Sequence, residues 1–588
     1  MNLSNIKYAV AASALLFGAT SCEDFLDRPG EDSYNTSTYY QTNDQLHSTS
    51  ATIYNSPWYD FQRGFLDIGE VMSGNMNKTC AYQTFTVNGT DENLVNMSAS
   101  LWSVNAYCNT LIKNVDELAG PATTEVVRKE VKGEALVWKA MAYFYLVRNF
   151  GGVPIIHNNT DMLASGNYNS VYRATKANVY QYIVNCLEKA IEWLPSKPST
   201  AGRIDQYSAK GLLAKVYLAK AGVTGTLNKE DLQKAVEYAT DVKNNSGRTL
   251  QPNYFELFRP LYNTCPESLI AWRWTVGADW TSQNSFQSDL AIGGFNEIGD
   301  IWGGWAGPSV DLIEAFGDSP LSASRMNADT RRKATCMMAG DVYEYFWEDY
   351  ASTFSKGGFE MLDFVFNDDA DVIASRNKMT GQGQTGINTG AQSVKHLVGD
   401  AFDHKDGTWG CGIAYDRMAS ALATHLLRLA DVYLILAEAQ ALIDGKTTTN
   451  AEALDAFNKV HMRACPGAKE VESLTWAEVW KERRLELAYE GDRWYDFVRL
   501  AYYDEAAARA ELASQKRGTI YGITDALKTY FKSGYQNWDV SNCGYDDKVD
   551  KSIDFNTISF ELPFPDTDKL TNPHLSEEPV DQEVPSYN

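Results

Sequence analysis

Five tryptophans lie close together in the middle of the chain. Trp272, Trp274, Trp280, Trp302 and Trp305 fall within 34 residues, whereas an even spread of 15 tryptophans over 588 residues would put about one there. An indole ring carries negative π density on its faces and a sugar ring presents polarised C–H groups, so the two surfaces stack. Neighbouring amides and carboxylates can bond the hydroxyls. This region is the first candidate for a ligand site.

The local sequence separates these tryptophans. Trp272 and Trp274 alternate in a strand-like run, which favours burial in a core, although both stay candidates. Trp280 stands in a loop rich in Asp, Ser, Gln and Asn, and loops on a rigid scaffold carry binding residues disproportionately. Trp280 is therefore the preferred ligand contact of these three.

A second group of residues that could do chemistry lies in WAEVWKERRLELAYEGDRWYDFVRL, residues 476–500. Its aromatic and aliphatic side chains recur at helical spacing, and Thr475 with Glu478 forms a capping box, so the stretch predicts one amphipathic helix. Arg483 and Glu490 interrupt the apolar stripe. Buried charges need partners, and we favour a structural ion-pair network over a catalytic site.

Helical periods dominate the flanking segments. Between 130 and 243 the pattern predicts four helices, with breaks at Gly151-Gly152, Pro195 and Gly222. Helical pairs of this length suggest tetratricopeptide-like stacking, although no clean internal repeat is present. Between about 252 and 412 the period fades, with a strand-like run at 268–276. Helices return at 418–442 and after a capping box at 449–452, and an extended, Pro-rich tail ends the chain.

Composition and motifs exclude several classes of function. The net charge of −24 argues against a nucleic-acid surface. Nine separate cysteines without a CxxC pair argue against a zinc site or a disulfide scaffold. Gly381, Gly383 and Gly386 match GxGxxG, but no strand precedes them and no helix follows, so a flexible loop is favoured. We expect no cofactor, no metal ion and no catalytic residue, although glycoside hydrolysis needs only two suitably spaced carboxylates and the chain has 76 acids.

The first residues are predicted to be a targeting signal and not part of the folded structure. Lys7 precedes a short apolar run and the small residues Thr20 and Ser21, which together indicate a secretory signal over residues 1–21. Cys22 follows at the expected cleavage point and resembles the lipidated cysteine of a bacterial lipobox, although Ala19 stands where Leu would be favoured. A multiply acylated cysteine anchors a protein stably in a membrane. Residues 22–45 are then interpreted as the lipidated cysteine and its tether.

Eight segments in the same order resemble the SusD/RagB family of surface lipoproteins. No single segment is specific, but the ordered set is, and only the terminal VDQEVPSYN departs from the family pattern. The segments are CEDFLD at 22–27, FYLVRNFGGVPII at 144–156, GRIDQYSAKGLLAKVYLAKA at 202–221, WAGPSVDLIEAFG at 305–317 followed by ADTRR, RLADVYLILAEA at 428–439, FNKVHMRAC at 457–465, ERRLELAYEGDRW within 476–500, and ELPFPDTDKLTNPHL near the end.

The resemblance implies a mainly α fold, a tetratricopeptide-like scaffold of helical pairs with a loop-rich, mixed binding subdomain. One domain would then span 46–588, with an N-terminal helical part at 46–251, a ligand-binding insert at about 252–412, and C-terminal helices and wrap at 413–588. Because Trp305 begins one of the family segments, Trp302 is the better ligand candidate of that pair.

The resemblance also implies function. Such proteins sit on the cell outer membrane through a lipid anchor, bind an oligosaccharide or polysaccharide, and deliver it to a SusC-like TonB-dependent transporter without catalysis. A peptide-capturing lid on the same scaffold is the alternative, and an extracellular glycosidase is a further one.

Family members tend to bring ligand contacts from the loop after the first long helix, which implies a second candidate edge within 67–102. Tyr82 suits stacking, while Asn75 and Glu70 suit hydrogen bonding to hydroxyls. A solvated loop explains the same residues equally well.

Overall fold

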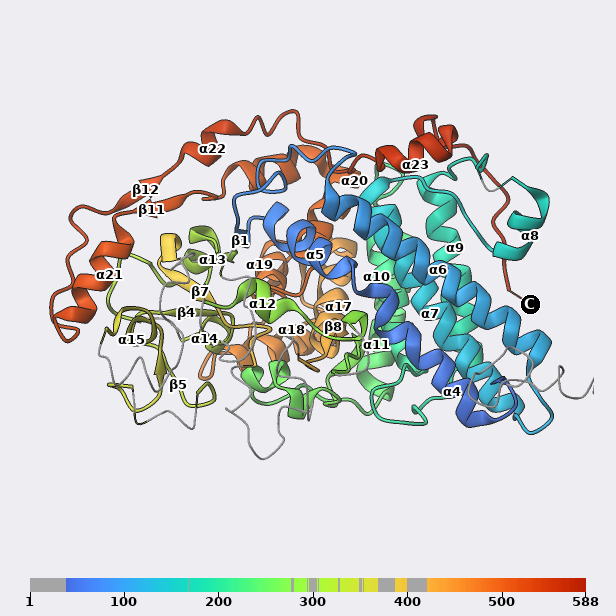
Figure 1. The fold of residues 1–588 in the computed structure, drawn as a ribbon, viewed down its shortest axis with the longest axis horizontal. Coiled ribbons are helices and arrows are strands. Elements are labelled where there is room, and N and C mark those ends of the chain that lie inside the picture. The colour runs from blue at the N-terminus through green and yellow to red at the C-terminus, as the bar shows by residue number, and fades with distance from the viewer. Residues whose placement is uncertain are drawn as a thin grey trace, which may run out of the picture.

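The computed structural model describes residues 39–587, apart from 168, 277–279, 293–294, 296–303, 305, 326–327, 348–351, 353, 369–386 and 399–419. Helices dominate, which confirms the predicted mainly α class. Long helices fill one half of the molecule and short elements fill the other (Figure 1). The first described helix, α4 (Asn43–Ala51), begins two residues before the predicted end of the tether, and its N-cap Thr42 forms a capping box with Gln45.

The long helices stack in chain order. Each packs on the next, so α6 contacts α7, α7 contacts α9, and the series continues through α10, α11 and α17 to α18 and α19. Stacking of this kind buries a continuous core, as in helical-repeat proteins. Their bounds are α6 Glu92–Leu118, α7 Glu125–Phe150, α9 Lys176–Trp193, α10 Gln206–Lys220, α11 Lys229–Asn245, α17 Leu429–Ile443, α18 Ala451–Ala464 and α19 Trp476–Glu486.

Local signals start and stop these helices as the sequence predicts. α7 begins after Thr124, whose side chain accepts a hydrogen bond from the Val127 N–H, and ends at Gly151 with φ +70°. The start of α18 differs from the prediction. Its N-cap is Asn450, whose side chain accepts from the N–H groups of Glu452 and Ala453, so no Thr449 capping box forms.

The predicted helix at 418–442 is wrong in its first part. Residues Thr424–Arg428 form strand β8, which pairs antiparallel with β2 (Ser268–Trp272), and α17 begins only at Leu429. A buried strand and a buried helix both present a continuous apolar run, so periodicity does not distinguish them. The predicted strand-like run at 268–276 is confirmed over its first five residues.

Most of the remaining described elements are short and lie in the other half of the fold, whereas α8 and α23 lie beside the long helices (Figure 1). The alternating aromatic residues at 343–347 do not form a continuous strand. Strand β5 ends at Tyr343, and Trp347 has φ +53°, which is outside the strand region.

The strands of the described residues form two-stranded antiparallel sheets. The pairs are β1 with β3, β2 with β8, β4 with β7, β5 with β6, β9 with β10 and β11 with β12. The further bounds are β1 Met76–Asn77, β3 Gly307–Pro308, β4 Cys336–Met338, β5 Val342–Tyr343, β6 Phe359–Glu360, β7 Ala391–Ser393, β9 Thr447–Thr448, β10 Leu474–Thr475, β11 Thr519–Tyr521, β12 Gly544–Asp546, α5 Phe61–Leu66, α8 Asn159–Ser165, α12 Phe286–Leu290, α13 Val310–Ala315, α14 Thr330–Thr335, α15 Met361–Phe366, α21 Ile523–Lys532, α22 Lys548–Ser552 and α23 Asp566–Thr571.

The stretch 476–500 forms two helices instead of the single helix predicted. α19 starts at the predicted Thr475 capping box and ends at Glu486, and α20 (Arg493–Ala513) follows after a turn. Tyr489 and Gly491 both have positive φ, +69° and +70°, which a helix cannot accommodate. Helical periodicity alone would place Glu490 on the apolar face of one long helix. Because of the turn, its side chain does not lie there.

Glu490 lies in a buried ion-pair network. Its carboxylate accepts from Arg428 Nε at 2.7 Å and from Lys395 Nζ at 3.0 Å, while Arg428 also binds Glu486 and Glu267. Burial alone would raise the pKa of the Glu490 carboxyl, but the two cations outweigh it and hold that pKa at about 2. The structural interpretation of this charge is confirmed.

Arg483 is the centre of a second network. Its guanidinium lies 2.6 Å from Asp431, 3.2 Å from Asp496 and 3.3 Å from Asp492. Lys215 of α10 bridges Asp431 and Asp492, both at 2.8 Å. The network therefore ties α10, α17, α19 and α20 together with buried charges.

The C-terminal segment runs back along one edge of the molecule and reaches the first helices (Figure 1). Phe564 stacks on Phe150 with ring centroids 5.0 Å apart. The Val580 N–H donates to the Arg173 carbonyl at 2.9 Å. Tyr587 accepts a 2.7 Å hydrogen bond from the buried Lys139 Nζ. The predicted surface wrap is therefore part of the packing of the N-terminal helices.

Candidate functional site

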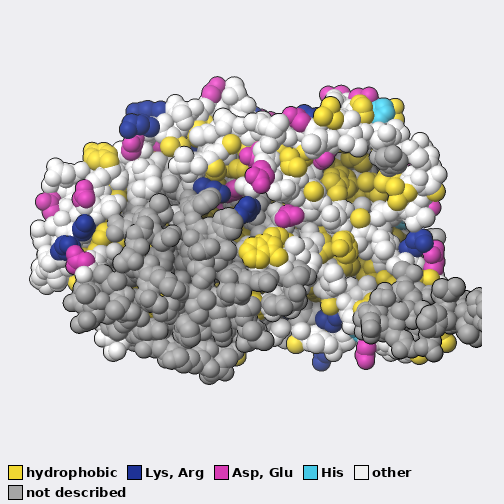
Figure 2. All heavy atoms as spheres, viewed as in Figure 1, with side chains coloured by type: hydrophobic (Ala, Val, Ile, Leu, Met, Phe, Trp, Pro, Cys, Tyr) yellow, Lys and Arg dark blue, Asp and Glu magenta, His cyan; other side chains and the backbone are white. Residues whose placement is uncertain are grey.

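Three segments meet around one small cavity that contains Trp280. They are the residues leading into α5, the first turn of α6, and the region from the 3-10 helix η6 (Trp280–Ser282) to α12. The cavity has a volume of about 180 Å³ and is lined by Tyr59, Asp60, Gln62, Arg63, Asn93, Asn96, Trp280, Ser285, Ser288 and Asp289. α5 and α12 lie near the middle of the face in Figure 1, and there Figure 2 shows hydrophobic side chains beside basic and acidic ones.

Trp280 is the exposed aromatic residue of this cavity. Its side chain is 42% exposed, and among the predicted ligand residues that the structure describes it is the one on the surface. The half-buried Tyr59 lies beside it, with ring centroids 6.4 Å apart and planes inclined at 64°. The exposed part of the Trp280 side chain is available for stacking.

Polar side chains around the rings are held by a hydrogen-bonded frame. Asn93 donates to Asp67 at 2.9 Å, and Asp67 is paired with Lys78 at 2.6 Å. By contrast, Asp60 and Asn96 have no side-chain hydrogen-bond partner within the described part of the chain. The frame positions one amide, and it leaves a carboxylate and a second amide available to hydroxyl groups.

The electrostatics of the cavity favour uncharged ligands over anions. Burial raises the pKa of the Asp289 carboxyl, while Arg63 and Lys78 oppose that shift. Burial likewise raises the pKa of the Tyr59 hydroxyl. The described lining residues thus include two acids and one arginine, so a ligand with many neutral hydroxyls suits them better than a polyanion.

Trp272 and Trp274 lie in the core, which overturns their assignment as ligand residues. Trp272 is fully buried and packs against Trp58 and Phe65, with centroids at 5.5 and 5.2 Å. Trp274 donates its Nε1–H to the Thr424 hydroxyl of β8 at 3.0 Å. As residues of β2 and its continuation, both point into the helical stack, so no ring face is left for a ligand.

Tyr82, Asn75 and Glu70 are buried as well, and their ligand assignment is corrected. The Tyr82 hydroxyl donates to Asp91, the N-cap of α6, at 2.7 Å. Glu70 accepts from Asn75 at 2.9 Å and from the Gly491 N–H at 2.7 Å. Burial raises the pKa of the Glu70 carboxyl to about 7. These residues join the loop to α6 and to the turn before α20.

Other predicted residues fall outside the described part of the chain. They are Trp302, Trp305, Cys22 and the glycines at 381, 383 and 386. Their roles stay predictions.

The sequence contains signals for several cavity residues that the tryptophan count missed. Asn93 and Asn96 lie three residues apart just after the Asp91 N-cap, which puts them on one face of a helix start. Both fall within the second predicted edge, 67–102, so that segment borders the Trp280 cavity through residues other than those chosen. Ser285, the N-cap of α12, and Ser288 show the same three-residue spacing, and Asp289 follows directly.

Two features are absent from the described part of the chain. No cluster of three or more His, Cys, Asp or Glu side chains is placed to hold a metal ion there. In the same part of the chain, no helix combines the length and apolarity needed to cross a bilayer.

Comparison with known proteins gives consistent matches. Residues 322–579 match the SusD family, and residues 24–218 match a family described as starch-binding and associating with the outer membrane. A SusD-like protein of Bacteroides ovatus is 31% identical over 597 residues, which cover 97% of each chain. SusD-like protein P2 of Formosa agariphila is 24% identical over 64% of this chain and 66% of its own.

Solved structures share the fold. One, determined with a xylogluco-oligosaccharide, is 28% identical and superposes with a TM-score of 0.74 over 92% of this chain and all of its own. A laminarin-binding SusD-like protein superposes with a TM-score of 0.60 at 20% identity, over 91% of this chain and 98% of its own, a likeness of fold alone.

Proposed function

This chain belongs to the SusD family, and from that premise we propose that it is a non-catalytic glycan-binding protein of the outer membrane. Trp280 would stack on the sugar ring, with Tyr59 beside it. The open groups of Asp60 and Asn96 would bond the hydroxyls.

The observation that carries this proposal is the exposure of Trp280 over a cavity lined by amides, hydroxyls and carboxylates. A large aromatic side chain is normally buried, and here Trp272, Trp274 and Trp58 follow that rule. The named ligands of two structurally similar proteins, a xylogluco-oligosaccharide and laminarin, support the carbohydrate class.

The proposal includes the surroundings of the protein. We infer that Cys22 is lipidated and anchors the chain in the outer membrane at the cell surface, and that a SusC-like TonB-dependent transporter receives the bound glycan. The family description of outer-membrane association supports the location. A Cys22→Ala variant should be released from the membrane fraction, and a variant that stays firmly bound there would refute the anchor.

Calorimetry or affinity electrophoresis against neutral glycans tests the binding function. Wild-type protein should bind at least one member of a panel derived from xyloglucan, laminarin and starch. Trp280→Ala should weaken that binding by about tenfold or more, the equivalent of one lost stacking contact and its burial. Tyr521→Ala is the matched control, since Tyr521 is 58% exposed and lines no part of the cavity.

The same experiments separate the alternatives. Peptides that co-purify with the protein, with no glycan bound, would support a peptide-capturing lid instead. Sugar products released from the panel by purified protein would support a glycosidase. Glycan binding that Trp280→Ala leaves unchanged would remove the site assignment but keep the function.

A further inference from the structure

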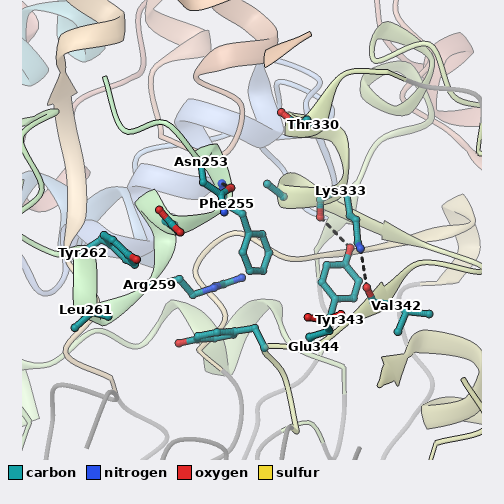
Figure 3. Close-up of a pocket in the computed structure, with 13 residues that line it drawn as sticks. Asn253, Phe255, Arg259, Leu261, Tyr262, Thr330, Lys333, Val342, Tyr343 and Glu344 are labelled. Atoms are coloured by element: carbon teal, nitrogen blue, oxygen red, sulfur yellow. Dashed lines mark hydrogen bonds between the residues drawn. The ribbon is translucent and has the colours of Figure 1, made fainter. Parts of the chain in front are cut away.

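A second and larger cavity lies on a different part of the surface. It opens between the 3-10 helices η4 (Tyr254–Phe258) and η5 (Pro260–Tyr262), α14 and β5, and its volume is about 680 Å³ (Figure 3). Ligand pockets typically measure about 300–1,000 Å³. None of the residues around Trp280 lines it. The described residues that line it include Phe255, Arg259 and Tyr343.

Aromatic rings form the walls of this cavity. Phe255 comes from η4, Tyr343 from β5 and Tyr345 from the loop that follows. The Tyr343 hydroxyl donates to the Lys333 carbonyl at 2.9 Å, and Lys333 Nζ donates to the Val342 carbonyl at 2.6 Å (Figure 3). These bonds hold the Tyr343 ring in place before any ligand arrives, which lowers the entropic cost of binding.

A buried arginine braces the same rings. The Arg259 side chain, 3% exposed, runs beneath the Phe255 ring toward the middle of the cavity (Figure 3). Its Cζ lies 3.5 Å from the Phe255 centroid and 4.0 Å from that of Tyr345, within cation–π distance.

Only one nitrogen of that guanidinium is satisfied. Nη1 donates to the carbonyls of Phe258 and Leu397 at 2.8 and 3.0 Å. Nε and Nη2 have no acceptor anywhere in the described structure, and no ion pair forms with a described carboxylate. An unmet buried donor costs free energy, so an oxygen atom of a ligand that reached this floor would be favoured.

The charges of the lining indicate which ligand fits. Arg259 and Lys333 are balanced by Glu256 and Glu344, and the whole chain carries −24, so a polyanion gains little here. Hydroxyl groups both donate to carboxylates and accept from a guanidinium. Aromatic walls suit the C–H face of a sugar ring.

We propose that this cavity is a second binding site for neutral carbohydrate on the same chain, with the half-buried Phe255 and Tyr345 as stacking walls, the buried Tyr343 behind them and Arg259 as its floor. The proposal rests on the glycan-binding function proposed above. Two sites on one chain let a polysaccharide engage both, and the second contact then benefits from a high effective concentration. Long chains should therefore bind more tightly than their short fragments.

Titration calorimetry with short xylogluco-, laminari- and malto-oligosaccharides tests the proposal. The variants are Phe255→Ala, Tyr262→Ala at the cavity rim, Trp280→Ala and the double variant Phe255→Ala/Trp280→Ala, with Tyr521→Ala as the matched control. For an oligosaccharide that binds, we expect two molecules per wild-type chain, one per single Phe255 or Trp280 variant and none for the double variant. Tyr262→Ala should weaken the second binding event without loss of folded protein, which circular dichroism checks.

The outcomes distinguish this inference from the function on which it rests. One molecule per wild-type chain, abolished by Trp280→Ala and unaffected by Phe255→Ala and Tyr262→Ala, would overturn the second site and keep the proposed function. No binding of any oligosaccharide in the panel would overturn both. If Phe255→Ala does not fold, the Tyr262→Ala titration decides alone: an unchanged second binding event overturns the proposal.

Discussion

The Nη1 atom of Arg483 lies 2.6 Å from the Oδ1 atom of Asp431, 52 residues away in the chain. The contact joins α19 to α17, and Lys215 extends it to α10 through the other oxygen of Asp431 at 2.8 Å. Burial by itself would lower the pKa of Arg483, but Asp496, Asp431 and further acids raise that pKa well above its ordinary value. The guanidinium is thus permanently charged, and its partners are required in the folded state.

Removing that guanidinium should unfold the protein or destabilise it severely. Arg483→Met leaves Asp431, Asp492 and Asp496 buried with fewer partners, and breaking a buried ion pair costs about 3–5 kcal/mol. Urea denaturation followed by circular dichroism measures the loss. Lys113→Met is the control, because its pair with Glu117 is exposed on α6 and is worth at most about 1 kcal/mol. A stable Arg483→Met variant that has lost only glycan binding would contradict the structural role.

The Glu490 network should lose stability in acid. The folded pKa of Glu490 is about 2, below the ordinary 4.5, so its contribution is complete above about pH 4.5 and is lost as pH falls through 2. The shift corresponds to about 3 kcal/mol. We expect the stability difference between wild type and Glu490→Gln to shrink from pH 5 to pH 2. A difference that stays constant over this range would rule out the depressed pKa. Glu505→Gln, at an exposed position, provides the baseline.

Glu70 should show the opposite dependence. Burial raises its folded pKa to about 7, so the unfolded chain ionises first and stability is lost as pH rises from about 4.5 to 7. The loss amounts to about 3 kcal/mol. Relative to Glu70→Gln, wild-type protein should therefore become less stable across this interval, whatever constant offset the substitution adds. Denaturation midpoints at half-unit steps of pH provide the measurement, and parallel curves for the two proteins would disprove the shift.

Two tryptophans eight residues apart should behave differently on truncation. Trp272→Ala removes a fully buried ring from the contact with Trp58 and Phe65, and such changes cost about 3–5 kcal/mol. Trp280→Ala, at the surface, should change stability by about 0.5 kcal/mol or less. Thermal denaturation compares them directly. Equal destabilisation by the two variants would mean that Trp280 is a core residue, against the proposed site.

Local patterns predicted the helical scaffold well, because helix signals act over one or two turns. The Thr475 capping box and the Gly151 stop are where the sequence places them. The predictions of secondary structure are wrong where a contact with a residue distant in the sequence determines the local conformation. Thr424–Arg428 is a strand because β2 lies beside it, and the helix at 476–500 breaks because the turn brings Glu490 to Arg428 and Lys395. Such pairings are not visible in a single stretch of sequence.

The candidate site was predicted only in part, for the same reason. Clustering in the sequence marked Trp280 as a ligand candidate together with Trp272 and Trp274. The chain nevertheless passes from the core to the surface within the eight residues from Trp272 to Trp280. Tyr59 and Asn96 come from segments more than 180 residues before Trp280, and nothing in either segment shows that it meets Trp280 in the fold. The second cavity is similar, since η4 and β5 contribute rings from positions nearly 90 residues apart.

The return of the C-terminal segment to the first helices has a consequence for how the protein is made. Phe564, Val580 and Tyr587 contact residues 139–174, so these contacts close loops of about 400 residues and form slowly. During synthesis at about 5–20 residues per second, α7 waits at least about 20 seconds for its last partner. Through that interval the side chains that the C-terminal segment covers, Phe150 and Lys139 among them, lack these partners.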